Sequence, residues 1–279
     1  MTHEAVVRLS VFTGIFAVMA VWEVLAPRHE QLLGRGVRWP SNIGVAVLDA
    51  ALVRVLFPMG AVAIALWCEA HGYELMHLLA VPRWVAIPIA VIILDLAVYG
   101  QHVLFHAVPI LWRLHRMHHA DTEFDVTTGS RFHPIEIVAS MVIKIGVVAL
   151  LGAPAVAVLI FEVLLNATSM FNHSNVRMPL ALDRVVRLLV VTPDMHRVHH
   201  SIAAQETHSN FGFNMPWWDR LFGTYRAQPA AGHDGMTIGL PVFREPTEQR
   251  LDNMLSQPFR EPEAPRAAET AADTHRPNA

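Results

Sequence analysis

Histidine recurs in this sequence at spacings that suit metal binding. His102 and His106 are four residues apart, and the pattern HxxHH occurs at 115–119 and again at 196–200. Residues three and four apart lie on one face of a helix, so a single helix can present two or three imidazoles together. Neutral imidazole is a common protein ligand for transition metals. The spacing therefore predicts a metal centre supplied by several helices.

The number of clustered histidines favours two metal ions. An ion takes about four or five nitrogen ligands, and the clusters together with the histidine of the NHSN stretch offer more than one ion can use. The chain lacks the paired ExxH motifs of carboxylate-bridged di-iron bundles. The predicted ligands are His102, His106, His115, His118, His119, His173, His196, His199 and His200. The pattern leaves open whether His133 and His208 join them.

Two carboxylates begin polar helix faces that end in a histidine. A 4-3-4 spacing leads from Asp95 through Tyr99 to His106, and the same spacing leads from Glu162 to His173. A carboxylate that accepts the second ring N–H of a ligand histidine fixes the orientation of that ring. We therefore expect Asp95, Tyr99 and Glu162 to support the metal ligands. Packing between membrane helices is the alternative role of the two carboxylates.

The composition favours an integral membrane protein with an all-α fold. Of the 279 residues, 53% are hydrophobic and 16% are charged, whereas about a quarter are charged in a typical soluble domain. The net charge is -3 and the arginines are scattered, so we expect no nucleic-acid partner. Cys68 is the single cysteine, which excludes an internal disulfide, an iron–sulfur cluster and a thiolate zinc site supplied by one chain.

Five apolar runs are each close to the ~20 residues that cross a bilayer, so the sequence predicts a bundle of four to five membrane helices. Arg28, Arg35 and Arg38 crowd the first connection, and the positive-inside rule places that loop in the cytoplasm. Counting onward puts every histidine cluster and the C-terminus on the same cytoplasmic side. The predicted crossings are 5–25, 43–67, 84–106, 136–151 and 153–171.

The chain divides into three predicted regions. Residues 1–89 are N-terminal membrane helices, residues 90–228 carry the histidines, and residues 229–279 form an extension. The extension is polar and contains prolines, so we expect it to be largely disordered. Residues 176–192 mix charged and apolar residues, which predicts an amphipathic helix at the membrane interface. The histidine-rich region should therefore form a cytosolic helical cap on the bundle.

The histidine stretches resemble those of the membrane fatty acid hydroxylase/sterol desaturase superfamily. The similar stretches, in order, are HVLFH, WRLHRMHHAD, RFHPIE, NHSN, TPDMHRVHHS and NFGFNMPWWDRLFGTYR, and they cover roughly 90–228. The resemblance implies that the nine histidines hold two iron ions, with zinc as another occupant. It also implies that Asn210 braces the ligand-bearing region. Related sequences more often have asparagine at position 208, so His208 is not expected to be a ligand.

The resemblance also implies an activity. Such enzymes use O2 to hydroxylate or desaturate an unactivated C–H bond of a lipid, for example a sterol, fatty acyl chain, carotenoid or ether lipid. Nothing in the sequence resembles a fused cytochrome b5 domain, so we expect electrons from a separate reductase, ferredoxin or cytochrome. The expected location is the bacterial cytoplasmic membrane.

Two other functions are compatible with clustered imidazoles. A zinc-dependent membrane hydrolase could use them around a metal-bound water, although no HExxH pattern supplies a general base. A histidine-rich metal-binding or transport protein is the other alternative. It would need histidines along a path through the bilayer, whereas the predicted topology gathers them at one membrane face.

Overall fold

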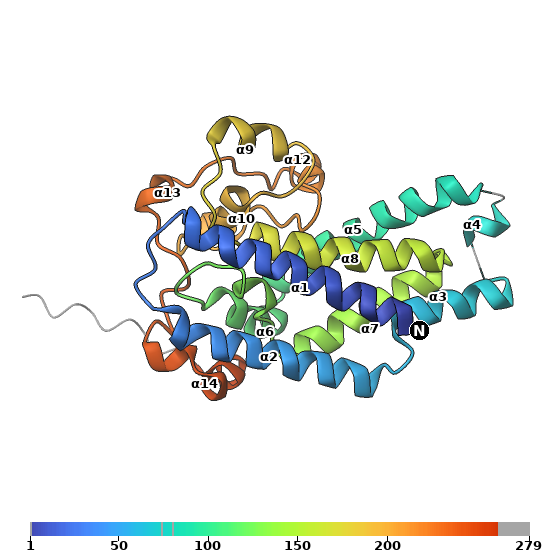
Figure 1. The fold of residues 1–279 in the computed structure, drawn as a ribbon, viewed down its shortest axis with the longest axis horizontal. Coiled ribbons are helices and arrows are strands. Elements are labelled where there is room, and N and C mark those ends of the chain that lie inside the picture. The colour runs from blue at the N-terminus through green and yellow to red at the C-terminus, as the bar shows by residue number, and fades with distance from the viewer. Residues whose placement is uncertain (1, 74, 80, 262–279) are drawn as a thin grey trace, which may run out of the picture.

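Long helices run side by side through most of the molecule, and short helices and loops gather at one end (Figure 1). The computed structural model describes residues 2–73, 75–79 and 81–261, and this part contains helices and no strand, which confirms the predicted all-α class. The long helices are α1 (Thr2–Leu25), α2 (Arg35–Leu56), α3 (Gly60–His71), α5 (Arg83–Ala107), α7 (Pro134–Leu151) and α8 (Ala155–Asn172).

Within the described residues, five stretches are long and apolar enough to cross a membrane, the number predicted from the sequence. They are Val6–Leu25, Arg35–His71, Arg83–Ala107, Pro134–Leu151 and Ala155–Asn172. The N-terminus lies at the end of the bundle opposite the short helices (Figure 1). Each crossing then reverses the chain direction, so the histidine-bearing segments all emerge at one end of the bundle.

The second predicted crossing is not one helix. The predicted crossing over 43–67 lies within one candidate span, Arg35–His71, but that span is interrupted, because α2 ends at Leu56 and α3 begins at Gly60. Pro58 lies in the break; it has no backbone N–H to donate, and it disfavours helical backbone at Phe57 before it. Gly60 follows with φ +65°, a conformation that suits glycine. Hydropathy continues through this break and does not reveal it.

Small residues pack the centre of the bundle. Helix α8 contacts α1, α3 and α5, and α7 contacts α2, α3 and α5. Ala61 and Ala65 of α3, Ala90 of α5 and Ala157 of α8 are buried in the main hydrophobic cluster. Membrane helices gain little from burying apolar surface against each other, so close backbone approach at small side chains stabilises their packing.

The cap consists of short elements that follow α5 and α8. They are α6 (Pro109–His119), η1 (Thr128–Ser130), α9 (Leu180–Val186), α10 (Pro193–His199), α11 (Ala204–Thr207), α12 (Trp217–Phe222), α13 (Gly232–Gly235), η2 (Pro246–Gln249), α14 (Leu251–Ser256) and η3 (Gln257–Phe259). One further short helix, α4 (Leu75–Leu78), lies at the far end of the bundle (Figure 1). The predicted amphipathic helix over 176–192 is shorter than expected, because only α9 is helical there.

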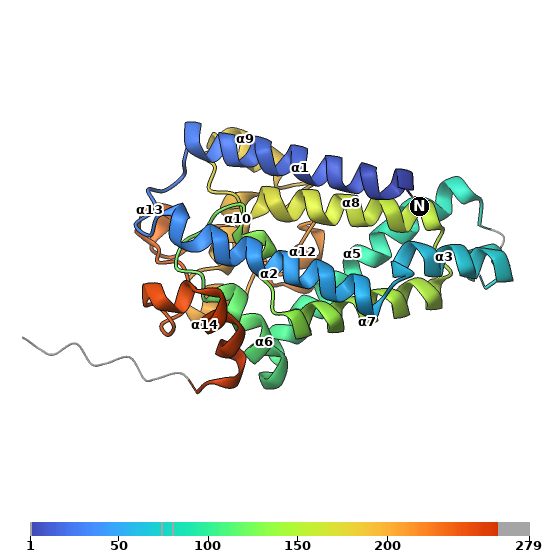
Figure 2. The same cartoon turned by 60° about the horizontal axis from the view of Figure 1, so that its bottom comes forward.

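The C-terminal extension is folded as far as it is described. The prediction of a largely disordered 229–279 is wrong for 229–261, where α14 packs against α2 and η3 packs against α6 (Figure 2). The polar side chains of this segment have partners in the cap: Gln249 donates to the Ala120 carbonyl at 3.1 Å and accepts from Arg131 at 2.8 Å. Buried hydrogen bonds of this kind hold the segment in place although its hydropathy is low. Residues 262–279 lie outside the described residues.

A buried ion-pair cluster joins α2 to the loop after α6. We call Arg38, Asp121 and Asp125 the Arg38 cluster. The Arg38 guanidinium donates to Asp121 and to Asp125, both at 2.6 Å, and the three side chains are fully buried. Burial alone would raise the pKa of Asp121, but the neighbouring Arg38 and Arg131 cations lower it to about 2. The cluster holds the C-terminal end of α6 against the bundle.

Candidate metal centre

The nine histidines predicted as ligands lie together in two buried groups. Within each group, one ring nitrogen per residue lies within 4.8 Å of those of the other members. We call them the five-histidine group and the four-histidine group. The five-histidine group contains His102, His106, His115, His119 and His199, and the four-histidine group contains His118, His173, His196 and His200.

Each HxxHH pattern supplies both groups. On α6, His115 and His119 are one turn apart and face the five-histidine group, while His118 faces the other group. On α10 the division is reversed, because His196 and His200 belong to the four-histidine group and His199 to the five-histidine group. Both helices begin with proline at a position that needs no backbone donor, which fixes where the helical register starts.

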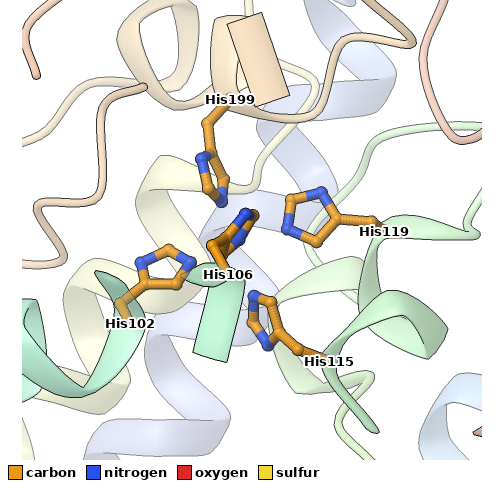
Figure 3. A group of neighbouring side chains, drawn as sticks. All are labelled: His102, His106, His115, His119 and His199. Atoms are coloured by element: carbon orange, nitrogen blue, oxygen red, sulfur yellow. The ribbon is translucent and has the colours of Figure 1, made fainter. Parts of the chain in front are cut away.

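The rings of the five-histidine group converge from three helices (Figure 3). The Nε2 atom of every member is buried and has no hydrogen-bond partner. The opposite nitrogen is held in several members: Nδ1 of His102 donates to the Phe211 carbonyl at 2.8 Å, and Nδ1 of His199 donates to the Ser209 carbonyl at 2.7 Å. A donating Nδ1–H leaves the lone pair on Nε2, directed into the group.

The four-histidine group lies beside the first. Nε2 of His173 is 3.2 Å from Nε2 of His118 and 3.0 Å from Nε2 of His196. Nδ1 of His173 donates to the Ser169 carbonyl at 2.8 Å, so the His173 lone pair also faces its group. Neither ring nitrogen of His200 has a partner. The ring centroids of His200 and His119 are 4.6 Å apart, so the two groups are neighbours.

Burial keeps six of the clustered imidazoles neutral. It lowers the pKa well below 6.5, and neighbouring imidazoles lower it further, for His118, His119, His196, His199 and His200. Burial also lowers the pKa of His173, to about 4. Neutral imidazole is the form that binds metal.

This donor set fits transition-metal ions. An unpartnered buried nitrogen is energetically costly, and the five Nε2 atoms of the five-histidine group are all of this kind. In the four-histidine group, Nε2 of His118 and Nε2 of His196 each lie within 3.2 Å of Nε2 of His173. Imidazole ligands suit iron, zinc, copper and nickel, so the set itself does not choose among these metals. The His102 to His106 stripe and both HxxHH patterns therefore lie where the sequence predicts. That they bind metal stays a prediction.

Comparison with known proteins assigns the chain to a family. The fatty acid hydroxylase family model matches residues 87–224, which include all nine histidines. The chain belongs to the fatty acid hydroxylase/sterol desaturase superfamily. No solved structure gives a significant match.

Similar curated proteins are hydroxylases and monooxygenases. Ornithine lipid hydroxylase OlsE of Rhizobium tropici is 28% identical over 89% of this chain and 74% of its own length. Alkylglycerol monooxygenase of Homo sapiens is 27% identical over 58% of this chain, which is 35% of that protein. Cholesterol 25-hydroxylase of Rattus norvegicus is 26% identical over 50% of this chain, or 47% of the relative.

A loop in this fatty acid hydroxylase domain positions two of the histidines through its backbone carbonyls. Asn210 has φ +52°, and its amide donates to the Met195 carbonyl at 2.9 Å while its oxygen accepts from the Arg226 N–H at 2.8 Å. Asp219 accepts from the N–H of Gly212 at 2.8 Å. A Cβ at Gly212 would lie 2.7 Å from an Asp219 oxygen, so this approach requires glycine. Through these contacts Asn210 ties the loop to α10 and to the segment at Arg226.

Asp95 and Tyr99 support the hydroxylase domain in a different way from the prediction. Asp95 accepts from Trp218 Nε1 at 2.8 Å and has no hydrogen bond to an imidazole. The Tyr99 hydroxyl is 2.9 Å from Oγ1 of Thr224, which donates to Asp219 at 2.6 Å. Both residues therefore anchor the cap loop whose backbone carbonyls hold the rings of His102 and His199. They can do so because the face of α5 that carries them points toward this loop. The expectation of a direct carboxylate–imidazole contact was wrong for Asp95.

Glu162 does not orient a histidine. Its carboxylate accepts from Lys144 of α7 at 2.9 Å and forms an ion pair with Arg8 of α1. It lies almost three helical turns before His173 on α8, within the bundle. The alternative role, packing between membrane helices, is the one that the contacts show. Spacing along one helix cannot reveal that cations from two neighbouring helices meet this carboxylate.

The carboxylate that contacts a clustered histidine is Glu136, which the sequence analysis missed. Nδ1 of His115 is 2.7 Å from Oε1 of Glu136, and both side chains are buried. Glu136 lies in the first turn of α7, where an acidic residue is common because it favours the helix N-terminus. The sequence feature that could have indicated this contact is the position of Glu136 in RFHPIE, at the start of an apolar helix.

His133 and His208 lie outside both groups. Nδ1 of His133 accepts from the Ile135 N–H at 3.2 Å, and Nε2 lies 3.2 Å from the Leu255 carbonyl, so His133 caps α7. His208 is exposed, and its Nδ1 is 3.3 Å from Nδ1 of His106. It contacts the rim of the five-histidine group without directing a nitrogen into it.

Proposed function

We propose that this protein is a membrane lipid hydroxylase that uses O2 and a pair of iron ions. The observation that carries the proposal is the convergence of nine buried histidines in two adjacent groups at one end of a membrane-helix bundle. The five-histidine group would hold one ion and the four-histidine group the other. Bound iron supplies the redox chemistry that activates O2 for attack on an unactivated C–H bond.

The proposed reaction needs an external electron donor. Conversion of one C–H bond and O2 into C–OH and water consumes two electrons and two protons. Among the described residues, two groups could hold a metal ion, and both are taken by the proposed iron pair. A separate reductase, ferredoxin or cytochrome would therefore provide the electrons. Similarity to hydroxylases and monooxygenases favours hydroxylation over desaturation.

The chain's own residues hold the imidazoles and keep water out. All nine rings are almost fully buried. The backbone carbonyls of Phe211 and Ser209 fix two rings of the five-histidine group, and that of Ser169 fixes one of the four-histidine group. Ring nitrogens fixed in this way need no reorganisation when a metal ion binds, so the geometry is present before loading.

The proposed membrane placement puts the cap against the cytoplasmic leaflet of a bacterial inner membrane. Leu182 of α9 and Leu221 and Phe222 of α12 are exposed, and these helices also carry exposed Arg184 and Arg220. Apolar and cationic side chains together are typical of helices that lie in the interface of an anionic membrane. This position would bring an acyl or ring substrate to the metal centre directly from the bilayer.

The relatives suggest which lipid to test first. The chain matches an ornithine lipid hydroxylase over most of its length, so an ornithine-containing acyl lipid is the first candidate. Alkylglycerols and sterols follow from the other two relatives. The three classes share a long apolar skeleton and a small polar head, which suits delivery from the membrane.

Lipid mass spectrometry tests the proposal. The full chain is expressed aerobically in a bacterium that makes ornithine lipids, beside His199→Ala and a matched control, His71→Ala. His71 ends α3 and lies outside both groups, so the control removes an imidazole without touching the metal centre. We expect a lipid with one added oxygen from the wild type and the control, and none from His199→Ala.

The alternatives give different results in the same experiment. A lipid product that has lost two hydrogen atoms, with no oxygen added, would identify the reaction as desaturation instead of hydroxylation. Product that forms without O2, in zinc-loaded protein, would identify a hydrolase. Altered cellular metal content with an unchanged lipidome would identify metal binding or transport. Equal activity of His199→Ala and the wild type would contradict the assignment of the metal centre.

A further inference from the structure

The partners of the clustered histidines differ in charge. In three cases the second ring nitrogen donates to a neutral backbone carbonyl: His102 to Phe211, His199 to Ser209 and His173 to Ser169. His115 instead faces the carboxylate of Glu136 at 2.7 Å. Among the described residues this is the carboxylate that hydrogen-bonds a member of either group.

The Glu136 side chain makes few other polar contacts. It is 3% exposed, and its second oxygen, Oε2, has no hydrogen-bond partner. No arginine or lysine forms an ion pair with it among the described residues, although Asp49 of α2 is close enough to interact with it electrostatically. A buried carboxylate without a cation is costly. A metal ion behind His115 would supply the missing positive charge.

The four-histidine group has no equivalent carboxylate contact. The charge of Asp121 reaches His173, but Asp121 is bonded to Arg38 at 2.6 Å and makes no hydrogen bond to a clustered histidine. Its negative charge is therefore paired with the Arg38 guanidinium. The two groups consequently differ by one uncompensated negative charge next to a ring.

A carboxylate does more than a carbonyl in this position. It fixes the ring with Nε2 toward the group, as a carbonyl would, and it also draws the Nδ1 proton, which makes Nε2 a more basic ligand. Removing such a partner typically costs about 10- to 100-fold in metal affinity. Nε2 of His115 lies among the unpartnered nitrogens of the five-histidine group, so the effect would act on the ion held there.

We propose that Glu136 is a positioning residue whose charge makes the five-histidine group bind its metal ion more tightly than the four-histidine group does. The inference rests on the proposed pair of metal ions and is independent of the lipid substrate. Glu136→Gln separates charge from position, because an amide oxygen of almost the same shape still accepts the His115 N–H. A loss of affinity in this variant therefore reports the charge.

Cobalt titration of the full-length protein in detergent tests the proposal. The protein is stripped with a chelator, and Co²⁺ binding is followed by visible absorption with a competing chelator present. His199→Ala and His118→Ala identify which binding step belongs to which group. Glu206→Gln is the matched control, because Glu206 is also a buried carboxylate but accepts from the Ala230 N–H at 2.6 Å, away from both groups.

We expect two binding steps in the wild type, with the tighter one lost in His199→Ala. Glu136→Gln should weaken that step by about 10-fold or more and leave the other unchanged. Glu206→Gln should change neither. Two wild-type steps that Glu136→Gln leaves intact, or weakens equally, would overturn the role of Glu136 alone. A single wild-type step would contradict the proposed metal pair, and with it this inference.

Discussion

The cap contains two buried polar regions that satisfy their atoms in opposite ways. In the Arg38 cluster, a guanidinium meets the carboxylates of Asp121 and Asp125 at 2.6 Å. In the histidine groups, buried ring nitrogens face one another, and every Nε2 of the five-histidine group has no hydrogen-bond partner among the described residues. The first region pairs its charges with one another, whereas the described residues leave ring nitrogens of the second without partners. Structural and metal-binding polar clusters can therefore be distinguished by their unpartnered atoms.

The largest effect is expected from breaking the complete region. Arg38→Ala leaves two carboxylates buried without their cation, which should lower the free energy of unfolding by about 3–5 kcal/mol. Chemical unfolding in detergent, followed by tryptophan fluorescence, measures this. Arg250→Ala is the control, because Arg250 and its partner Asp252 are both exposed and 3.3 Å apart, so its loss should hardly change the free energy of unfolding. Equal destabilisation by both variants would remove the distinction between the regions.

A smaller effect is expected from emptying the second region. Metal at about 100 times its dissociation constant should stabilise the fold by about 2.7 kcal/mol, and a chelator should remove that stabilisation. Thermal unfolding with and without the chelator measures the difference. The difference should vanish in His199→Ala combined with His118→Ala and persist in His71→Ala. A chelator effect that survives loss of both ligands would place the metal elsewhere.

In the metal-free protein, the two polar regions should lose their contributions to stability over different pH ranges. The folded-state pKa of His173 is about 4, below its ordinary 6.5, so the unfolded chain binds more protons and stability falls as pH drops from 6.5 to 4. The pKa of Asp121 is about 2 instead of 3.8, so its contribution, about 2 kcal/mol, is lost only between pH 3.8 and 2. Unfolding free energies measured against pH test this. Arg38→Ala should abolish the lower window and keep the upper one.

The sequence contains enough to predict which histidines gather, but not which residues hold them in place. Imidazoles at helical spacing predicted the groups, because the periodicity of a helix fixes which residues share a face. The same periodicity assigned Asp95 to a histidine, although its partner is Trp218, far along the chain. It missed Glu136, because the contact depends on how α7 is turned toward α6. Partners on other elements follow from packing, which spacing does not encode.

The sequence predicted the fold to about the same extent as it predicted the site. Hydropathy located five crossings, because about 20 apolar residues are needed to span a bilayer. It did not locate the break at Pro58, and it misjudged residues 229–261, where a few polar side chains such as Gln249 are buried with distant partners. Composition reports the average environment of a segment. Gln249 shows that a polar residue can be fully buried when the rest of the cap supplies its hydrogen bonds.

The contacts of the C-terminal segment bear on when the protein matures. Arg113 of α6 donates to the Pro258 carbonyl at 2.7 Å, and Arg116 donates to the Gln257 carbonyl at 2.5 Å. These carbonyls follow both the last membrane helix and every clustered histidine in the chain. All the membrane helices are therefore synthesised before the C-terminal segment is available to pack against α6. A metal ion that needs all nine clustered histidines could therefore bind only after translation has passed the last of them.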